Sequence, residues 1–345
     1  MKDLEKPPVF VVGNPKSGTS LMQSLLDGHP ELFVSPVEFK LFKFFDTPSL
    51  PPANLPVGRV RRRTAPLSVG LGDFAEIKQA ILRSWDFKQL LEGEELERRV
   101  RVSQSDFDRE LFKREFLAEQ ANSSRDVYLH MFRALRLATK LVSHDALRVS
   151  VEKTPHLEEH AELLSKWFDG ARFVHLLRNP YANVYSIHRN ERKRHRRIGT
   201  YMMMCHSFYF LERNLEFVPN YLCIRYEDLV SSPEQTMRRV AKHLGIRFEE
   251  TMMTPTVLGK PWGGNSSSST RFQRVSSDSL EAYRERIPAI DIAIINKLFS
   301  GVMNKWDYEL VPKPRLRHWI PSLREDPLTY LENRYFLTSY PEHWQ

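Results

Sequence analysis

Residues 8–27 read PVFVVGNPKSGTSLMQSLLD, and this stretch decides the fold. Residues 8–12 form a short apolar run, and residues 19–27 carry apolar side chains at helical spacing. The stretch therefore predicts a strand, a loop and a helix. The loop from Gly13 to Ser20 has two glycines at the spacing of a nucleotide-binding phosphate loop. We infer that its backbone N–H groups and the positive end of the helix form a cradle for an anion.

The side chains of this loop add hydrogen-bond donors and one positive charge, from Lys16, Ser17, Thr19 and Ser20. A Walker A loop places its lysine directly after the second glycine, but here Thr19 follows Gly18 and the lysine lies inside the loop. A later apolar strand ends at Arg178, where an ATPase usually offers a carboxylate for magnesium. We therefore expect Arg and Lys side chains, rather than a metal, to neutralise the bound anion.

Strand and helix patterns continue to alternate along the chain. Short apolar strands are expected at 148–152, 171–177 and 221–225. The helices expected after them are 154–168, one that starts just after Pro180, and 232–245, with Thr154 and Ser232 as predicted caps. This alternation predicts an α/β fold, a P-loop-like three-layer sandwich around a central parallel sheet. Ligands of such folds bind beyond the carboxyl ends of the strands.

We expect one domain, residues 1–345, with two additions to the α/β core. Residues 74–145 have the pattern of helices with charged faces and no strand, which predicts a helical insertion or lid at about 50–145. Residues 312–345 hold several prolines and aromatic residues without clear periodicity and form a predicted C-terminal extension. The Gly- and Ser-rich stretch 259–270 is expected to be a flexible loop.

The composition suits a chain with a sizeable core, since 41% of its 345 residues are hydrophobic. No stretch approaches the roughly 18 uninterrupted apolar residues of a membrane helix, and the N-terminus lacks the apolar region of a signal peptide. We therefore expect a soluble, cytoplasmic protein with no membrane span. Both cysteines, Cys205 and Cys223, have apolar or aromatic neighbours, so we expect buried free thiols, and a cysteine-based metal site is excluded.

The net charge is +8, from 51 Lys and Arg residues against 43 Asp and Glu residues. Such an excess suits a nucleic acid, an anionic membrane or a small polyanionic ligand. The densest basic run, RNERKRHRR at 189–197, is either a phosphate-binding patch or a solvated helix face. Charge alone does not choose between these partners.

The motifs together resemble the family of sulfotransferases that depend on 3′-phosphoadenosine 5′-phosphosulfate (PAPS), in its bacterial-type and tyrosylprotein-sulfotransferase-like branch. PKSGTSLM at 15–22 is similar to the family's 5′-phosphosulfate loop, and LLRNPYANVYS at 176–186 is similar to its 3′-phosphate motif. The resemblance covers residues 8–46 and 148–290 and implies the following PAPS-binding residues: Lys16, Ser17, Gly18, Thr19 and Ser20 for the 5′ side, Arg178 and Ser186 for the 3′-phosphate, Tyr226 against the adenine, and Trp262, Asn265, Ser266 and Arg274 in a late loop over the nucleotide.

The resemblance also implies the chemistry, which is metal-independent in-line displacement of a sulfuryl group from PAPS onto a hydroxyl or amine. Positioning and charge stabilisation would supply most of the catalysis, with Lys16 near the transferred group. Lys153, in EKTPH at 152–156, is either a second catalytic cation or a strand-end lysine beside a capped helix. The acceptor must lose a proton, and Glu38 in HPELFVSPVEFKLF is the predicted base. His29, His156 or no base in this segment are the alternatives.

Two other functions remain open at the level of the sequence. A P-loop kinase would need Mg²⁺ and ATP, and the misplaced lysine argues against it. A basic nucleic-acid-binding protein that uses residues 189–197 would bind with a strong inverse salt dependence, but the paired phosphate motifs would then have no role. We expect a small-molecule or natural-product acceptor and no nucleic acid partner. The acceptor is not identified, and a homodimer is left open.

Overall fold

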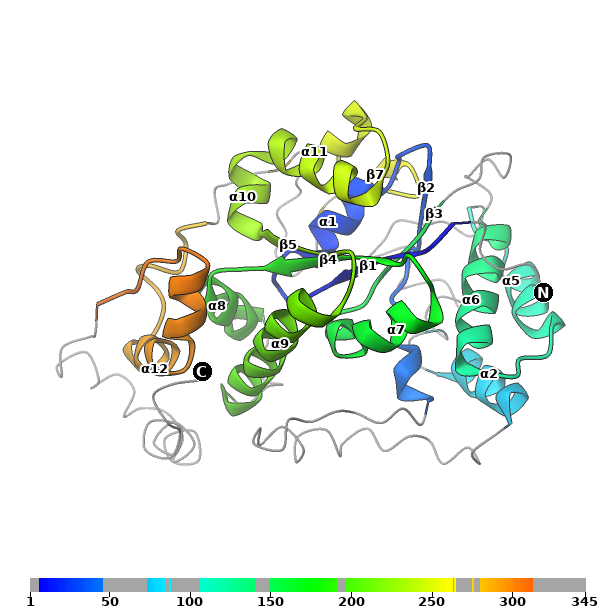
Figure 1. Cartoon of the computed structure of the whole chain (residues 1–345), viewed down its shortest axis with the longest axis horizontal. Helices are drawn as coiled ribbons and strands as arrows, with labels where there is room; N and C mark the ends of the chain where they lie inside the picture. Colours follow the sequence, from blue (N-terminus) through cyan, green and yellow to red (C-terminus); the bar gives the residue numbers. More distant parts are fainter. Residues whose placement is uncertain are drawn as a thin grey trace.

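The computed structural model describes residues 6–45, 73–84, 87, 106–139, 149–190, 197–262, 264, 275 and 280–312. At its centre lies a five-stranded sheet in the spatial order β2-β3-β1-β4-β5, in which every neighbouring pair is parallel (Figure 1). The strands are β1 (Val9–Val12), β2 (Leu32–Val34), β3 (Val149–Lys153), β4 (Arg172–Leu177) and β5 (Tyr221–Arg225). The predicted α/β fold with a central parallel sheet is confirmed.

Helices cover both faces of the sheet because successive strand residues point to opposite sides. Val9 and Val11 of β1 pack with α1 and α11, whereas Phe10 and Val12 pack with α6 and α7. Figure 1 shows α1, α10 and α11 above the sheet and α7 and α9 below it. The bounds of these helices are α1 (Thr19–Leu26), α6 (Ser124–Ala138), α7 (Ala161–Trp167), α9 (Arg197–Phe217), α10 (Tyr226–Ser231) and α11 (Pro233–Leu244).

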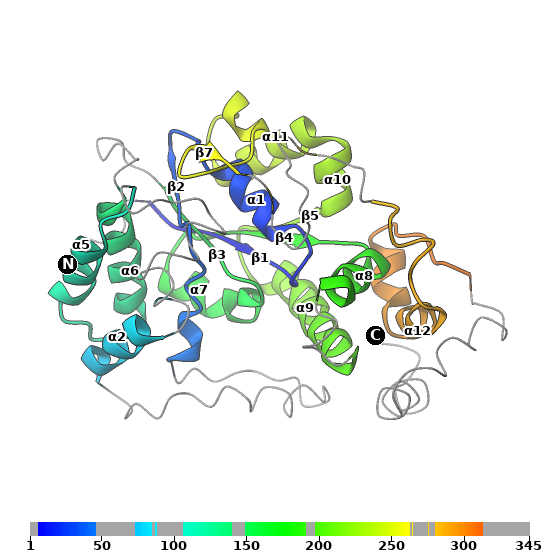
Figure 2. The same ribbon diagram turned by 180° about the vertical axis from the view of Figure 1, so that it is seen from behind.

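The remaining elements gather at the two ends of the sheet, as the opposite view also shows (Figure 2). One end holds α2 (Phe74–Arg83) and α5 (Arg109–Ala118), and the other holds α8 (Pro180–Asn190) and α12 (Ala289–Lys305). Short elements complete the described chain, namely the 3₁₀ turns η1 (Leu41–Lys43), η4 (Leu157–His160) and η5 (Glu250–Met253) and the hairpin of β6 (Thr256–Val257) and β7 (Lys260–Pro261).

The helix cap predicted at Thr154 is wrong, and the cap predicted at Ser232 is right in position only. The Thr154 hydroxyl donates to the carboxylate of Glu152 instead of capping a helix, and α7 begins only at Ala161. His156 has a left-handed backbone with φ of 65°, which interrupts any helix that starts at Thr154. Ser232 does precede α11, but its side chain makes no cap hydrogen bond.

The helical middle of the chain is described in part, as α2, α5 and α6. Tyr128 and Phe132 of α6 contact Phe10 of β1 at ring-centroid distances of 6.4 and 6.5 Å, so this helix packs directly on the sheet. The division into core, insertion and extension stays a prediction, because residues 46–72 and 313–345 lie outside the described residues. In the predicted flexible loop, residues 260–261 belong to the β6–β7 hairpin, and 265–270 are not described.

Both cysteines are free and buried, as predicted. Burial raises the pKa of the Cys205 thiol to about 12 and raises that of Cys223 as well. Among the described residues, no helix has the length and apolar character needed to cross a membrane.

Candidate functional site

The carboxyl ends of all five strands meet at one edge of the sheet because the strands are parallel. In spatial order from β2 to β5, the chain at or after each strand end carries Glu38, Lys153, Lys16, Arg178 and Tyr226. Since neighbouring strands lie about 4.8 Å apart, this row spans about 19 Å. The structure therefore brings five predicted site residues from five separate segments to the same edge.

The phosphate loop after β1 has a backbone that depends on glycine. Gly13 and Gly18 have φ values of 131° and 105°, and a Cβ on Gly13 would lie 2.6 Å from the backbone oxygen of Leu176. Inside the loop, the amide of Ser17 donates to the oxygen of Asn14 over 3.1 Å. Helix α1 then begins without a side-chain cap, so the positive end of α1 faces the loop.

Two residues that the sequence analysis did not identify form hydrogen bonds to this loop. The buried Glu158 accepts a hydrogen bond from the Gly13 amide over 3.1 Å. Asn183 of α8 accepts one from the Asn14 side chain over 2.5 Å and donates one to the oxygen of Pro15 over 2.9 Å. Their contacts join positions 145 and 169 residues apart, which no local pattern indicates.

The charge state of Glu158 follows from its neighbours. Burial would raise the pKa of Glu158, yet this pKa is lowered, by nearby His156 and by hydrogen bonds such as the one from Ser207 over 2.6 Å. Glu158 is therefore an ionised carboxylate, and in this form it accepts the hydrogen bond from the Gly13 amide. Charge-assisted hydrogen bonds of this kind are stronger than neutral ones.

Arg178 links the end of β4 to the phosphate loop. Its Nη1 donates to the oxygen of Lys16 over 2.8 Å, and its guanidinium lies 4.4 Å from the ring centroid of Tyr226. The same tyrosine ring contacts the loop, since a Cβ on Gly18 would lie 2.5 Å from its Cδ2 atom. The residues predicted for the 5′ side, the 3′-phosphate and the adenine thus form one contiguous group.

The loop and its surroundings fit an anionic ligand. Within the described part of the chain, the buried Oγ of Ser17 and Nε of Arg178 have no hydrogen-bond partner. Buried polar atoms are nearly always paired, so two unpaired donors beside an uncapped helix start suit phosphate oxygens. Ser186 lies one turn beyond Asn183 on α8, on the side of the helix that faces the loop.

Glu38 forms the acidic part of the row, at the β2 end. Its carboxylate lies 2.5 Å from Nζ of Lys153, which is 6% exposed, and 3.1 Å from Nζ of Lys40. Burial favours the neutral carboxyl, but the two ammonium groups outweigh burial and hold the pKa of Glu38 below its ordinary value. Glu38 is therefore ionised at neutral pH and able to accept a proton.

The two histidine alternatives occupy different places. His29 lies before β2, at the opposite edge of the sheet, and its ring contacts the oxygen of Arg247 over 2.8 Å and the amide of Glu31 over 3.1 Å. His29 is thus a structural turn residue. His156 stays beside the phosphate loop, because its amide donates to the oxygen of Gly13 over 3.4 Å.

The late loop is described only at its start. Trp262 follows β7, and its amide donates to the oxygen of Pro255 over 2.9 Å. Asp27, after the end of α1, holds this hairpin through Thr256 and the amide of Gly259. The predicted residues Asn265, Ser266 and Arg274 lie outside the described residues.

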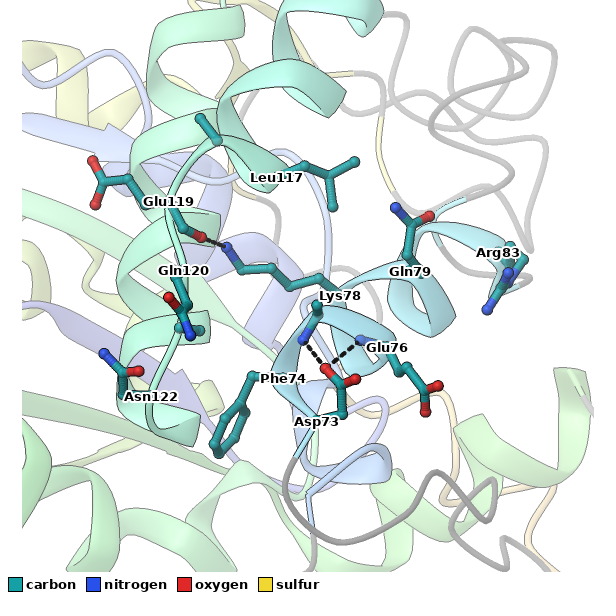
Figure 3. A pocket seen from close by; sticks show the side chains of 13 residues that line it. Asp73, Phe74, Glu76, Lys78, Gln79, Arg83, Leu117, Glu119, Gln120 and Asn122 are labelled. Carbon is teal, nitrogen blue, oxygen red and sulfur yellow. Dashed lines mark hydrogen bonds between the residues drawn. The ribbon is translucent and has the colours of Figure 1, made fainter.

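A pocket of about 1240 Å³ lies elsewhere, between α2 and the turn that joins α5 to α6 (Figure 3). None of its lining residues belongs to the row at the strand ends. In this pocket the buried Lys78 donates to the oxygens of Phe116 and Glu119, over 2.7 Å each, and burial lowers the pKa of Lys78 to about 8. Lys78 thereby binds carbonyls at the end of α5, which is a structural role.

Comparisons with known proteins identify the family and the fold. A family model described as "Sulfotransferase family" matches residues 7–250. The protein-tyrosine sulfotransferase 2 of Gallus gallus is 24% identical over 301 residues, which cover 82% of this chain and 65% of the chicken protein. The match thus spans less than two thirds of the length of that relative.

Solved structures of other proteins share the fold, among them two sulfotransferase domains. The sulfotransferase domain of the Synechococcus PCC 7002 olefin synthase is 18% identical, with a TM-score of 0.56, and the match covers 90% of this chain and 99% of that domain. The sulfotransferase domain from the curacin biosynthetic pathway is 17% identical, with a TM-score of 0.55. That match covers 89% of this chain and 99% of that domain. At these identities the likeness concerns the fold.

Proposed function

The chain belongs to the sulfotransferase family, and on that premise we propose that it transfers a sulfuryl group from PAPS to a hydroxyl or amine of an acceptor. The observation that carries this proposal is the contact between the two phosphate elements, in which Nη1 of Arg178 donates to the oxygen of Lys16 over 2.8 Å. The 5′- and 3′-phosphates of PAPS are both attached to its ribose, so two cationic sites on neighbouring strand ends suit it, and β1 and β4 are neighbours.

The chain's own residues have the following proposed roles. The phosphate loop and Lys16 hold the 5′ side, Arg178 and Ser186 hold the 3′-phosphate, and Tyr226 lies against the adenine. PAPS supplies the sulfuryl group when it is bound. Glu38 takes the proton of the acceptor, because its carboxylate is ionised and lies at the β2 end of the row. Lys153 provides positive charge beside Glu38.

The acceptor is proposed to be a small molecule or natural product with a nucleophilic hydroxyl or amine. The similarity to the Gallus gallus enzyme favours one second candidate, the tyrosine of a peptide. Incubation with sulfur-labelled PAPS and both acceptor classes separates these candidates, because label would enter either a small phenol or amine, or a tyrosine-containing peptide.

Calorimetric titration with 3′-phosphoadenosine 5′-phosphate (PAP), the desulfated product, tests the proposed donor. We expect micromolar or tighter binding that needs the 3′-phosphate and no added metal, with adenosine 5′-phosphate and ATP with Mg²⁺ as comparison ligands. A preference for ATP with Mg²⁺ would instead place the protein among nucleotide phosphotransferases. Absence of binding to every nucleotide would contradict the proposal.

A further inference from the structure

Glu152 lies directly behind the Glu38–Lys153 ion pair, and the proposed mechanism gives it no role. It is the second-last residue of β3 and its side chain is fully buried. One carboxylate oxygen, Oε1, accepts two hydrogen bonds, from the amide of Phe39 over 3.4 Å and from the hydroxyl of Thr154 over 2.5 Å. Phe39 directly follows Glu38 in the chain, and Thr154 directly follows Lys153. A single oxygen therefore binds the backbone amide of the residue after Glu38 and the side-chain hydroxyl of the residue after Lys153.

We propose that Glu152 is a positioning residue that holds Glu38 against Lys153 through Phe39 and Thr154. This inference rests on the proposed function, in which Glu38 accepts the proton of the acceptor. Glu38 lies on an irregular segment after β2, where no strand or helix fixes the backbone. The hydrogen bond from Phe39 ties that segment to β3, whose last residue is Lys153.

The second oxygen of Glu152 supports a role beyond stability. Oε2 is buried and has no hydrogen-bond partner in the described part of the chain. An unpaired buried polar group destabilises the folded state. Burial, together with the charge of Glu38, raises the pKa of Glu152 to about 7, although Thr154, Phe39 and Lys153 act in the opposite direction. A buried carboxyl that destabilises the fold in this way is expected where it holds functional groups.

The groups that face Glu152 set the design of the test. They are Glu38 and Lys153 of the ion pair and the buried Tyr128 of α6. Glu152→Gln and Glu152→Leu both remove the charge of Glu152, so both remove its repulsion of Glu38 equally. Only Gln keeps an oxygen that accepts from Phe39 and Thr154. The difference between the two variants therefore reports the two hydrogen bonds alone.

The experiment follows the titration of Glu38 by carbon-13 NMR in protein labelled at the glutamate carboxyl groups, with Glu38→Gln to assign the signal. We expect the pKa of Glu38 to stay below its ordinary value in Glu152→Gln and to rise towards that value in Glu152→Leu. Equal titration of Glu38 in both variants would overturn the proposal. If Glu152→Leu does not fold, Thr154→Val replaces it, because it removes one of the two hydrogen bonds and nearly preserves side-chain volume.

Turnover and PAP affinity of the same samples keep this inference separate from the proposed function. We expect Glu152→Leu to lose at least tenfold in turnover, Glu152→Gln to stay near wild type, and both to bind PAP as wild type does. Failure of the wild type to bind PAP would contradict the proposed donor, while the titration of Glu38 would still decide the role of Glu152. Loss of PAP binding in Glu152→Leu alone would indicate general damage to the site and count against a positioning role.

Discussion

The guanidinium of Arg178 donates a hydrogen bond to the backbone oxygen of Lys16 over 2.8 Å, so a side chain at the end of β4 holds the loop at the end of β1. The connections that leave these neighbouring strands run towards opposite edges of the sheet. β1 leads to β2 at one edge, and β4 leads to β5 at the other edge. Open α/β sheets bind their ligands at such a point. The proposed 3′-phosphate site and 5′ loop are therefore mechanically linked.

Replacing Arg178 should weaken the binding of PAP. We expect Arg178→Ala to cost about 2–5 kcal/mol of binding free energy, because it removes a charge-assisted contact and the support of Lys16 together. The PAP affinity of Arg178→Lys should lie between those of the wild type and Arg178→Ala, since lysine keeps the charge but lacks the planar guanidinium. Calorimetry with PAP measures both, and Arg114→Ala, on the exposed side of α5, is the control. Unchanged affinity in Arg178→Ala would exclude Arg178 from the nucleotide site.

A methyl group on Gly18 should disturb the site without unfolding the protein. In Gly18→Ala the new Cβ would lie 2.5 Å from Cδ2 of Tyr226, at a backbone φ of 105° that alanine disfavours. We expect Tyr226 to shift and PAP affinity to fall at least tenfold. The matched control is Gly199→Ala in α9, where a Cβ meets nothing within 4 Å. Equal PAP affinity in both variants would argue against contact between Tyr226 and the nucleotide.

Local patterns were enough to predict four of the five strands of the sheet and the phosphate loop, whereas the three-residue strand β2 (Leu32–Val34) was not predicted. The predicted strand 221–225 matches β5 at both ends, and those at 148–152 and 171–177 agree with β3 and β4 to within one residue. These segments are short apolar runs bounded by Gly, Pro or charged residues, so their period and their ends are visible in the sequence. The parallel order of the strands then brought the predicted site residues to one edge.

Side-chain hydrogen bonds, one of them local and others between distant segments, explain what the sequence did not predict. Thr154 followed by a proline has the pattern of a helix cap, but the buried carboxylate of Glu152 competes for its hydroxyl. Glu158 and Asn183 hold the phosphate loop from helices that follow other strands. No local signal marks Glu158, whereas Asn183 lies within the motif that joins Arg178 to Ser186.

Glu38→Gln should separate proton transfer from nucleotide binding. Loss of a general base typically lowers turnover by a factor of about 10²–10⁴, and PAP affinity should stay near wild type because Glu38 lies at the far end of the row. Glu110→Gln is a matched control, since Glu110 also pairs with a lysine but is 84% exposed. Assays of turnover and calorimetry are both required. Wild-type turnover in Glu38→Gln would remove Glu38 as the base.

The two thiols should be inert in the folded protein. Cys205 and Cys223 are 5% and 3% exposed, and burial raises the pKa of both thiols, so very little thiolate is present at pH 8. We expect iodoacetamide to leave both unmodified in buffer and to label both in concentrated urea, as followed by mass spectrometry. Rapid labelling of either thiol in buffer would contradict its burial.

The raised pKa of Glu152 makes stability depend on pH in a direction that a single substitution reveals. The carboxyl has an ordinary pKa of 4.5 and a pKa of about 7 in the folded protein. Between these two values the folded state holds more protons than the unfolded state, so the free energy of unfolding falls as pH rises. The loss is fully developed above pH 7 and reaches at most about 3 kcal/mol.

Glutamine does not titrate, so Glu152→Gln escapes this loss. We expect the free energy of unfolding of Glu152→Gln, relative to wild type, to increase by about 1–3 kcal/mol between pH 4.5 and pH 8. Urea denaturation followed by tryptophan fluorescence measures both proteins at each pH, and the pH effects of groups that do not interact with Glu152 cancel in the difference. Glu110→Gln should show no such change, because its carboxyl is exposed. A difference that stays constant from pH 4.5 to pH 8 would mean that Glu152 ionises normally and that burial does not raise its pKa.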